Sequence, residues 1–146
     1  LILRVAVGAA FVFHGWFKIT SPGGMTAWMG PDAPVPGFFQ AAAALSEFLG
    51  GVGLILGLLT PLASFFLACT MIVAVGMVHL PNNDPFVSPT GGRSWELAAG
   101  YLAAALAVLL AGPGRLSLDY CLFGRGPSPA RDREGTAATS QGGFRS

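Results

Sequence analysis

Charged residues are scarce in this 146-residue chain: Asp, Glu, Lys and Arg make up 10% of it, whereas hydrophobic residues make up 53%. Soluble domains usually carry about a quarter charged residues. Most of the chain therefore does not need to face water. The formal net charge is only +1, so the composition gives no reason to expect a nucleic-acid partner.

Cysteine and histidine are also rare. The two cysteines, Cys69 and Cys121, form no CxxC pair and are expected to lie too far apart to form a disulfide. The two histidines, His14 and His79, take part in no Glu-x-x-His or His-x-x-x-His spacing. These patterns predict no metal site, show no evident cofactor, and assign no catalytic residue.

Long apolar segments dominate what is present. They cover residues 1–19, 38–59, 62–80 and 95–111, approximately. Each has close to the roughly 17–25 residues that a membrane-spanning helix needs. Strands are not expected, because an open strand leaves its backbone polar groups unsatisfied in lipid. The sequence therefore predicts an all-α fold, a bundle of four transmembrane helices that occupies residues 1–123 and is surrounded by membrane lipid.

The distribution of positive residues predicts the orientation. Arg4, Arg115 and the arginines of the last residues would share one side of the membrane, while Lys18 and Arg93 would lie on the other. The positive-inside rule then places both termini in the cytoplasm and both long loops outside. This predicts a multi-pass protein of the bacterial inner membrane. Residues 124–146 are polar and are expected to form a disordered cytoplasmic tail.

Five ionisable side chains lie within the apolar segments or at their edges: His14, Lys18, Glu47, His79 and Glu96. Charged groups at membrane depth are costly and usually face a bundle interior or a wet cavity. In the predicted topology all five fall in the outer half of the bundle, and the inner half is expected to be free of charge. The sequence therefore predicts a polar pocket in the outer half.

Glu47 and Lys18 are expected to pair inside this pocket. Glu47 lies beside a helical face of small residues that should pack against a neighbouring helix, so its side chain is expected to point into the bundle. The residues of this face are Ser46, Gly50, Gly53 and Gly57. An unpaired carboxylate there would become protonated, and Lys18 of the first segment is its natural counter-ion. The pair is compatible both with a structural lock that fixes helix register and with a functional site.

Several ligands suit such a pocket. Imidazole and carboxylate groups can hydrogen-bond a quinone carbonyl and exchange protons with it. Four aromatic side chains of the first segment would supply aromatic surface close by, although such residues more often simply face lipid: Phe11, Phe13, Trp16 and Phe17. A metal ion is less suited, because Lys18 would repel it. Passage of a proton or small solute conflicts with the charge-free inner half.

The segment after the fourth helix contains Arg115 and Asp119. These two residues are predicted to anchor the chain at the inner interface and to pair with each other. The preceding Gly112-Pro113-Gly114 ends the fourth helix by combining flexible glycines with a helix breaker.

Taken in order, these motifs resemble the DoxX family of bacterial membrane proteins. The resemblance covers residues from about 3 to 119 and rests on the following segments: His14-Gly15-Trp16-Phe17-Lys18, Glu47-Phe48-Leu49-Gly50-Gly51, Gly57-Leu58-Leu59-Thr60-Pro61, His79, Gly91 to Glu96, and Gly112 to Asp119. It implies a four-helix membrane fold. It also implies a link to membrane redox chemistry, because some similar proteins are associated with thiosulfate oxidation coupled to quinone or with thiol and oxidative-stress defence.

Two functions follow as expectations. The first is a membrane subunit of a redox complex, at most an oxidoreductase subunit that acts with a soluble redox partner protein and holds a quinone or similar small molecule in the outer pocket. The second is a non-enzymatic membrane protein, either a small-solute carrier or an assembly factor, that uses the polar cluster as a structural lock. Self-association into a homo-oligomer is compatible with both.

Overall fold

Helices account for the regular structure of the part of the chain that the computed structural model describes, residues 1–124. In chain order they are α1 (Ile2–Ile19), α2 (Gly37–Leu56), α3 (Thr60–Val73), the π-helix η1 (Ala74–His79), α4 (Glu96–Ala111) and the short α5 (Leu118–Phe123). The all-α prediction is confirmed over these residues. The predicted tail, apart from Gly124, lies outside them.

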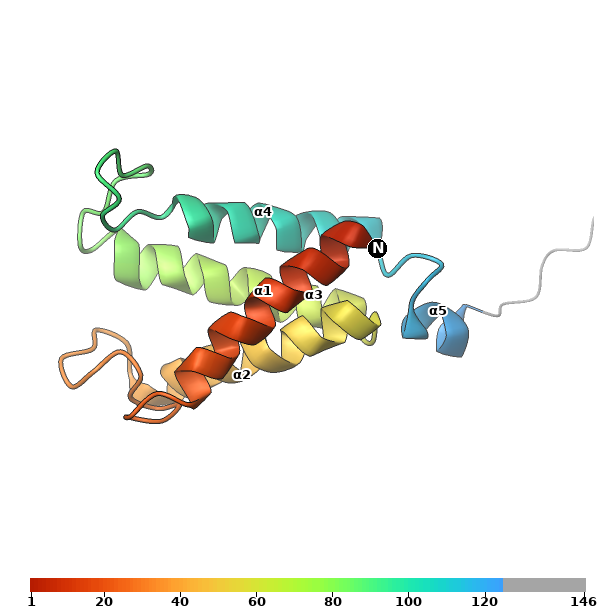
Figure 1. Cartoon of the computed structure of the whole chain (residues 1–146), viewed down its shortest axis with the longest axis horizontal. Helices are drawn as coiled ribbons and strands as arrows, with labels where there is room; N and C mark the ends of the chain where they lie inside the picture. The colour runs from red at the N-terminus through yellow and green to blue at the C-terminus, as the bar shows by residue number, and fades with distance from the viewer. Residues whose placement is uncertain (125–146) are drawn as a thin grey trace, which may run out of the picture.

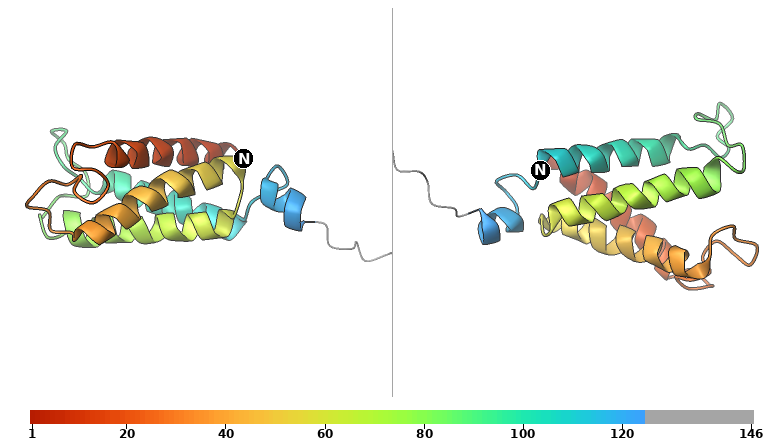
Figure 2. Two further views of the ribbon diagram at one scale, coloured as in Figure 1. Left: turned by 90° about the horizontal axis from the view of Figure 1, so that it is seen from below. Right: turned by 180° about the vertical axis from the view of Figure 1, so that it is seen from behind.

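The long helices run lengthwise between the two ends of the bundle, with α1 oblique to α4, and η1 continues α3 without a break (Figures 1 and 2). Both long loops lie at one end of the bundle, here called the loop end. The N-terminus, the α2–α3 turn and α5 lie at the other, here called the N-terminal end (Figure 1). This is the arrangement of loops and termini that the sequence predicted.

The length and surface of the helices suit a membrane. Within residues 1–124, three helices are long and apolar enough to span it, Ile2–Ile19, Gly37–Leu56 and Thr60–His79, while Glu96–Ala111 is a shorter apolar helix. Large apolar side chains also face outward, including Phe38 at 78% and Leu110 at 86% exposure. So much exposed apolar surface is unfavourable in water and favourable in lipid. The four-helix membrane fold is therefore confirmed.

The turn between α2 and α3 differs from the prediction by a few residues. α2 ends at Leu56, because Gly57 takes a left-handed conformation (φ 68°) that stops a helix. α3 then begins at Thr60, with Pro61 in its first turn. The sequence does not reveal where α2 ends, because the apolar residues continue past Leu56. Gly57 was instead assigned to the small-residue packing face.

The closest helix contact joins α1 to α2 through glycines. A Cβ atom on Gly8 would lie 2.7 Å from the carbonyl oxygen of Gly51, and one on Gly51 would lie 2.6 Å from that of Gly8. A Cβ on Gly15 would overlap the Phe48 backbone. The predicted small-residue face of α2 packs against α3 instead, since Gly50 lies against the Leu67 side chain of α3. Small residues thus let the helix carrying Lys18 approach the helix carrying Glu47.

We expect Gly51→Ala to destabilise the protein by about 1–3 kcal/mol, because the added methyl group would push α1 away from α2. The matched control is Gly100→Ala on α4, where a Cβ would meet nothing within 4 Å and should be neutral or stabilising. Thermal unfolding in detergent, followed by circular dichroism, compares the two variants. Equal unfolding temperatures would contradict the assigned contact.

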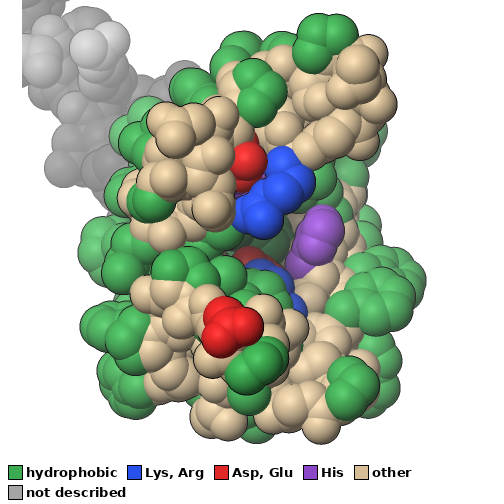
Figure 3. Space-filling model, turned by 90° about the vertical axis from the view of Figure 1, so that its left-hand side faces the viewer, with side chains coloured by type: hydrophobic (Ala, Val, Ile, Leu, Met, Phe, Trp, Pro, Cys, Tyr) green, Lys and Arg blue, Asp and Glu red, His purple; other side chains and the backbone are tan. Residues whose placement is uncertain are grey.

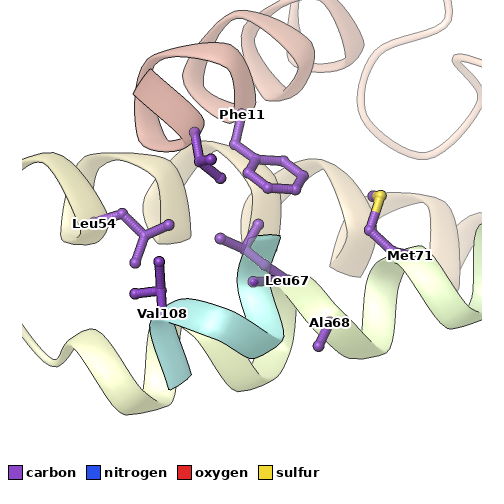
Figure 4. Close-up of a cluster of buried hydrophobic side chains, with 8 residues drawn as sticks. Phe11, Leu54, Leu67, Ala68, Met71 and Val108 are labelled. Carbon is purple, nitrogen blue, oxygen red and sulfur yellow. The ribbon is translucent and has the colours of Figure 1, made fainter. Parts of the chain in front are cut away.

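The hydrophobic core occupies the middle of the bundle (Figure 4). Phe11, Leu54 and Leu67 are almost completely buried, and Val108 of α4 packs with them. This apolar layer separates the polar groups of the loop end from those of the N-terminal end. Phe11 and Met71 belong both to the core and to the lining of a cavity above it.

Candidate functional site

A cavity of about 470 Å³ lies at the loop end of the bundle. Figure 3 looks onto this end and shows acidic, basic and histidine side chains gathered around a hollow. The lining comes from α1, α2, α3, η1, α4 and both long loops. It includes four ionisable groups from the helices, His14, Lys18, Glu47 and His79, and apolar walls such as Phe11 and Tyr101.

The Lys18–Glu47 pair forms the most deeply buried charged part of this cavity. Lys18 Nζ lies 2.5 Å from both carboxylate oxygens of Glu47. Glu47 is 2% exposed and the Lys18 side chain 19%. The ion pair predicted from the sequence is therefore confirmed. Each partner neutralises the other, so the pair can remain charged away from water.

The loop between α1 and α2 folds over this pair. The Lys18 ammonium lies 4.5 Å from the centre of the Trp28 ring, a cation–π contact. The Trp28 indole N–H donates to the Gln40 carbonyl oxygen at 3.1 Å, and the Met29 N–H donates to the Gln40 side chain at 3.1 Å. Gln40 is itself buried. Trp28 thus covers Lys18 and also lines the cavity.

The rim of the cavity carries a second group of charges. His79 Nδ1 lies 2.8 Å from Asp84 Oδ2, and Arg93 Nε lies 3.3 Å from the same oxygen. His79 is the last residue of η1, whose i→i+5 hydrogen bonding replaces that of α3 just where Ala74, Val78 and His79 line the cavity. Short π-helical turns of this kind are rare in proteins, and those that occur are often found at functional sites.

An aromatic wall completes the cavity. The Tyr101 ring of α4 contacts Phe11 (centroids 5.0 Å apart) and meets His14 edge-on (5.7 Å). The cavity therefore offers a flat apolar surface beside hydrogen-bonding groups, a combination typical of small-molecule sites.

Known proteins resemble this chain in sequence. A model of the DoxX family matches residues 1–80, more than half of the chain. The chain belongs to the DoxX family. Its similarity to the Escherichia coli protein named Inner membrane protein YqjF is 29% identity over 122 residues, which cover 84% of this chain and 90% of that protein.

Two further relatives are similar to this DoxX protein. An uncharacterized protein of Haemophilus influenzae is 31% identical over 122 residues, 83% of this chain and 88% of its own. The Bacillus subtilis protein named "Putative oxidoreductase CatD" is 30% identical over 123 residues, 84% of this chain and 86% of its own. No solved structure gives a significant match.

Four of the five ionisable residues singled out from the DoxX sequence come together in the cavity. The fifth, Glu96, does not line it; it is exposed in the first turn of α4, where a negative charge favours the helix dipole. Arg93, which directly follows the loop glycines Gly91 and Gly92, lines the cavity instead. Of the predicted aromatic walls, Phe11 lines the cavity, whereas Phe13, Trp16 and Phe17 are exposed.

Besides Arg93, three contributors to the site were missed by sequence reasoning: Asp84, Trp28 and Tyr101. Asp84 and Trp28 lie in loops, where spacing does not reveal what a side chain contacts, and Tyr101 looks like an ordinary interfacial aromatic residue. The one usable signal was that Asp84 is an acidic residue five positions after His79 in a segment that is otherwise poor in charge.

The N-terminal end of the bundle is not free of buried charge, contrary to the sequence-based expectation. Arg4 is 4% exposed and donates hydrogen bonds to the carbonyl oxygens of Pro113 and Leu116. Asp119, in α5, accepts from the backbone N–H groups of Leu59 (2.7 Å) and Thr60 (2.8 Å). α5 itself was not predicted; Ser117 caps its first turn by accepting from the Tyr120 N–H.

The predicted pairing of Arg115 with Asp119 is wrong. Arg115 is exposed, and the Asp119 carboxylate is occupied by the α2–α3 turn. Burial raises the pKa of Asp119, but the hydrogen bonds from Thr60 and Leu59 and the charge of Arg4 outweigh burial and lower the pKa below its ordinary value of 3.8. A role of Arg115 at the membrane interface stays a prediction.

The donor set of the cavity does not resemble a metal centre. Among residues 1–124, no three His, Cys, Asp or Glu side chains converge closely enough to hold an ion. Glu47 and Asp84 are each engaged by a cationic side chain. What the cavity can do is hydrogen-bond a small molecule and exchange protons with it through His79, Lys18 or Glu47.

Proposed function

We propose that the cavity binds the head group of a lipid-soluble quinone, and that this DoxX protein is a membrane subunit of a redox complex. The observation that carries the proposal is the buried Lys18–Glu47 pair in the wall of an aromatic-lined cavity that opens among membrane helices. A quinone ring is flat and apolar and has two carbonyl acceptors. Tyr101 and Phe11 suit its face, and the N–H groups of Lys18, His79 and Arg93 suit its oxygens.

The charge balance favours a neutral ligand. Lys18 and Glu47 cancel each other, and Arg93 and Asp84 do the same at the rim. A charged ligand would lose its hydration without gaining an unpaired counter-ion, which is costly in a buried site. A neutral quinone loses little hydration and gains hydrogen bonds.

Reduction of a quinone requires two electrons and two protons. The described residues contain no redox-active pair, since both cysteines are free and Cys69 and Cys121 lie on different helices. We therefore assign the electrons to a reduced soluble partner protein that docks at the loop end, and the protons to the side chains around the cavity. The name of the Bacillus subtilis relative, which includes the word oxidoreductase, supports a redox role.

The same proposal places the protein in the bacterial inner membrane, crossing it several times with both termini in the cytoplasm. The name of the Escherichia coli relative supports the membrane. The excess of arginine at the N-terminal end, with Arg4 and Arg115, supports the orientation. The cavity would then open toward the outside.

A structural lock is the second candidate, and one observation favours it. The Lys18–Glu47 pair joins α1 to α2, while Trp28 and Gln40 tie the intervening loop over it. This arrangement fixes helix register even without a ligand. A solute carrier is less well supported, because the core at Phe11, Leu54 and Leu67 separates the polar groups of the two ends.

Quinone binding can be measured directly, because Trp28 lines the cavity and a bound quinone should quench its fluorescence. We expect decylubiquinone to quench the detergent-solubilised protein saturably. Trp28→Phe should remove the saturable part, and Trp16→Phe, at an exposed position, should retain it. Ala98→Phe, which fills the cavity from α4, should weaken binding at least tenfold.

The matched control for Ala98→Phe is Ala103→Phe, an exposed position on the same helix, which should bind like the wild type. Saturable quenching that is equally strong in Ala98→Phe would remove the cavity as the binding site. Absence of saturable quenching in the wild type would favour the structural lock.

A further inference from the structure

His79 and Asp84 at the rim are joined by two hydrogen bonds, one between their side chains and one between their backbones. The side chains meet at 2.8 Å between Nδ1 and Oδ2, and the Asp84 backbone N–H also donates to the His79 carbonyl oxygen at 3.1 Å. Asn83, between them, takes a left-handed conformation (φ 54°) that turns the chain back. Asp84 is therefore held against His79 by its backbone as well as by its side chain.

Arg93 strengthens this arrangement from the other side of the loop. Its Nε lies 3.3 Å from the same oxygen of Asp84 that contacts His79, and the Asp84 side chain is only 9% exposed. An ionised carboxylate can only accept a hydrogen bond, so the nitrogen of His79 that faces it must carry the proton.

A favourable interaction of the Asp84 carboxylate with the end of η1 does not explain why an aspartate stands at this position. It follows the C-terminal end of η1, where the helix dipole is negative and a carboxylate is unfavourable. What the position provides is a contact with His79, a residue that lines the cavity.

We propose that His79 is the group that exchanges a proton with the bound quinone through Nε2, and that Asp84 is the positioning residue that keeps the other proton on Nδ1. This inference rests on the proposed function. It goes further by assigning the proton step to one of the two histidines and by giving a role to a loop aspartate. A carboxylate that accepts a hydrogen bond from one imidazole nitrogen sets the tautomer and the orientation of the ring.

Two electrons from the reduced partner and two protons convert the quinone to the quinol. One of these protons leaves Nε2 of the His79 imidazolium as a new O–H bond forms at the nearer quinone oxygen. The neutral imidazole then keeps Nδ1–H donated to Asp84 and takes up a proton again at Nε2 from water at the loop end. The second quinone oxygen takes its proton from another group of the cavity.

Ionisable side chains from four other elements line the cavity or its rim beside His79. Lys18 and His14 belong to α1, Glu47 to α2, Asp84 and Arg93 to the loop before α4, and Tyr101 to α4. Two full negative charges and two full positive charges are present besides His79 itself.

Nitrogen-15 NMR of the full-length protein in detergent tests this assignment without a redox partner. The chain has only two histidines, so comparison with the spectrum of His14→Gln assigns the His79 resonances, and the quinone is then added to the wild type. Neutral His79 is expected to carry its proton on Nδ1. Added decylubiquinone is expected to shift the Nε2 resonance, while Trp28 fluorescence reports binding independently.

Asp84→Asn is the positioning variant. It keeps the size of the side chain but removes the charge, so we expect a mixture of the two tautomers and less than a twofold change in quinone affinity. Asp32→Asn, an exposed aspartate in the other long loop, is the control and should leave the His79 spectrum unchanged.

An Nδ1–H tautomer that depends on Asp84, with a quinone-induced shift at Nε2, supports the inference. A neutral His79 protonated on Nε2, or quinone binding seen by Trp28 without any shift at His79, overturns the inference and leaves the proposed function standing. Failure of quinone to bind at all overturns both.

Discussion

Glu47→Leu is expected to cost about 3–5 kcal/mol of stability, enough to lose most of the folded protein. The substitution removes a carboxylate that is 2% exposed and leaves the Lys18 ammonium without its partner beneath Trp28. Lys18 retains 19% exposure, so a movement of its side chain toward water would relieve part of this cost and place the loss near the lower value. Thermal unfolding and size-exclusion chromatography in detergent measure the effect.

The double variant Lys18→Met/Glu47→Leu separates structure from function. Replacing both members of a buried pair with apolar residues of similar size is often neutral or stabilising, so we expect the fold to return to within about 1 kcal/mol of the wild type. Quinone binding should nevertheless be lost if the pair contacts the ligand. A double variant that is folded and binds decylubiquinone normally would show that the pair is a structural lock.

Glu96→Leu is the matched control for Glu47→Leu. It makes the same change on an exposed residue, and the lost interaction with the α4 dipole is worth no more than about 1 kcal/mol. If Glu96→Leu and Glu47→Leu were equally destabilising, burial of the carboxylate would not be the cause.

Hydropathy and charge were enough to predict the four helices and to bring His14, Lys18, Glu47 and His79 to one end. The reason is physical: lipid demands long apolar helices, and a rare charged group within them must find a partner inside. Lys18 was the only lysine available for Glu47, which made their pairing predictable.

Loop geometry was the part that the sequence did not reveal. Asp84 contacts His79 because Asn83 turns the backbone, and Trp28 reaches Lys18 because Gln40 binds its indole N–H. Neither contact leaves a periodic pattern. The same limitation explains why Arg115 was chosen as the partner of Asp119: sequence proximity favoured it, while the actual partners lie about sixty residues away.

The contact between α5 and the α2–α3 turn leads to the second large effect. Asp119→Leu would leave the N–H groups of Leu59 and Thr60 without their acceptor in a turn where Thr60 is completely buried. Each unsatisfied group costs about 1–3 kcal/mol, so we expect a loss of about 2–5 kcal/mol. Leu59 adds to the effect, because it holds an unfavourable left-handed conformation (φ 49°) that this hydrogen bond supports.

Arg115→Gln is the control for this variant and should change stability by less than about 0.5 kcal/mol, since Arg115 is exposed. Hydrogen exchange of residues 112–124 offers a local measurement. Asp119→Leu should release α5 and speed up exchange there, whereas Arg115→Gln should not. The reverse result would restore the pairing that sequence proximity suggested.

The lowered pKa of Asp119 also predicts how stability depends on pH. Because the carboxylate binds its proton less readily in the folded state than in the unfolded state, its contribution is fully present above the ordinary value of 3.8 and is lost as the pH falls through the lower folded value. Asp119→Asn cannot ionise. The difference in unfolding temperature between wild type and Asp119→Asn should therefore be constant above the ordinary pKa of 3.8 and shrink below it. A difference that stays constant throughout acidification would mean that the charge of Asp119 does not hold α5 against the turn.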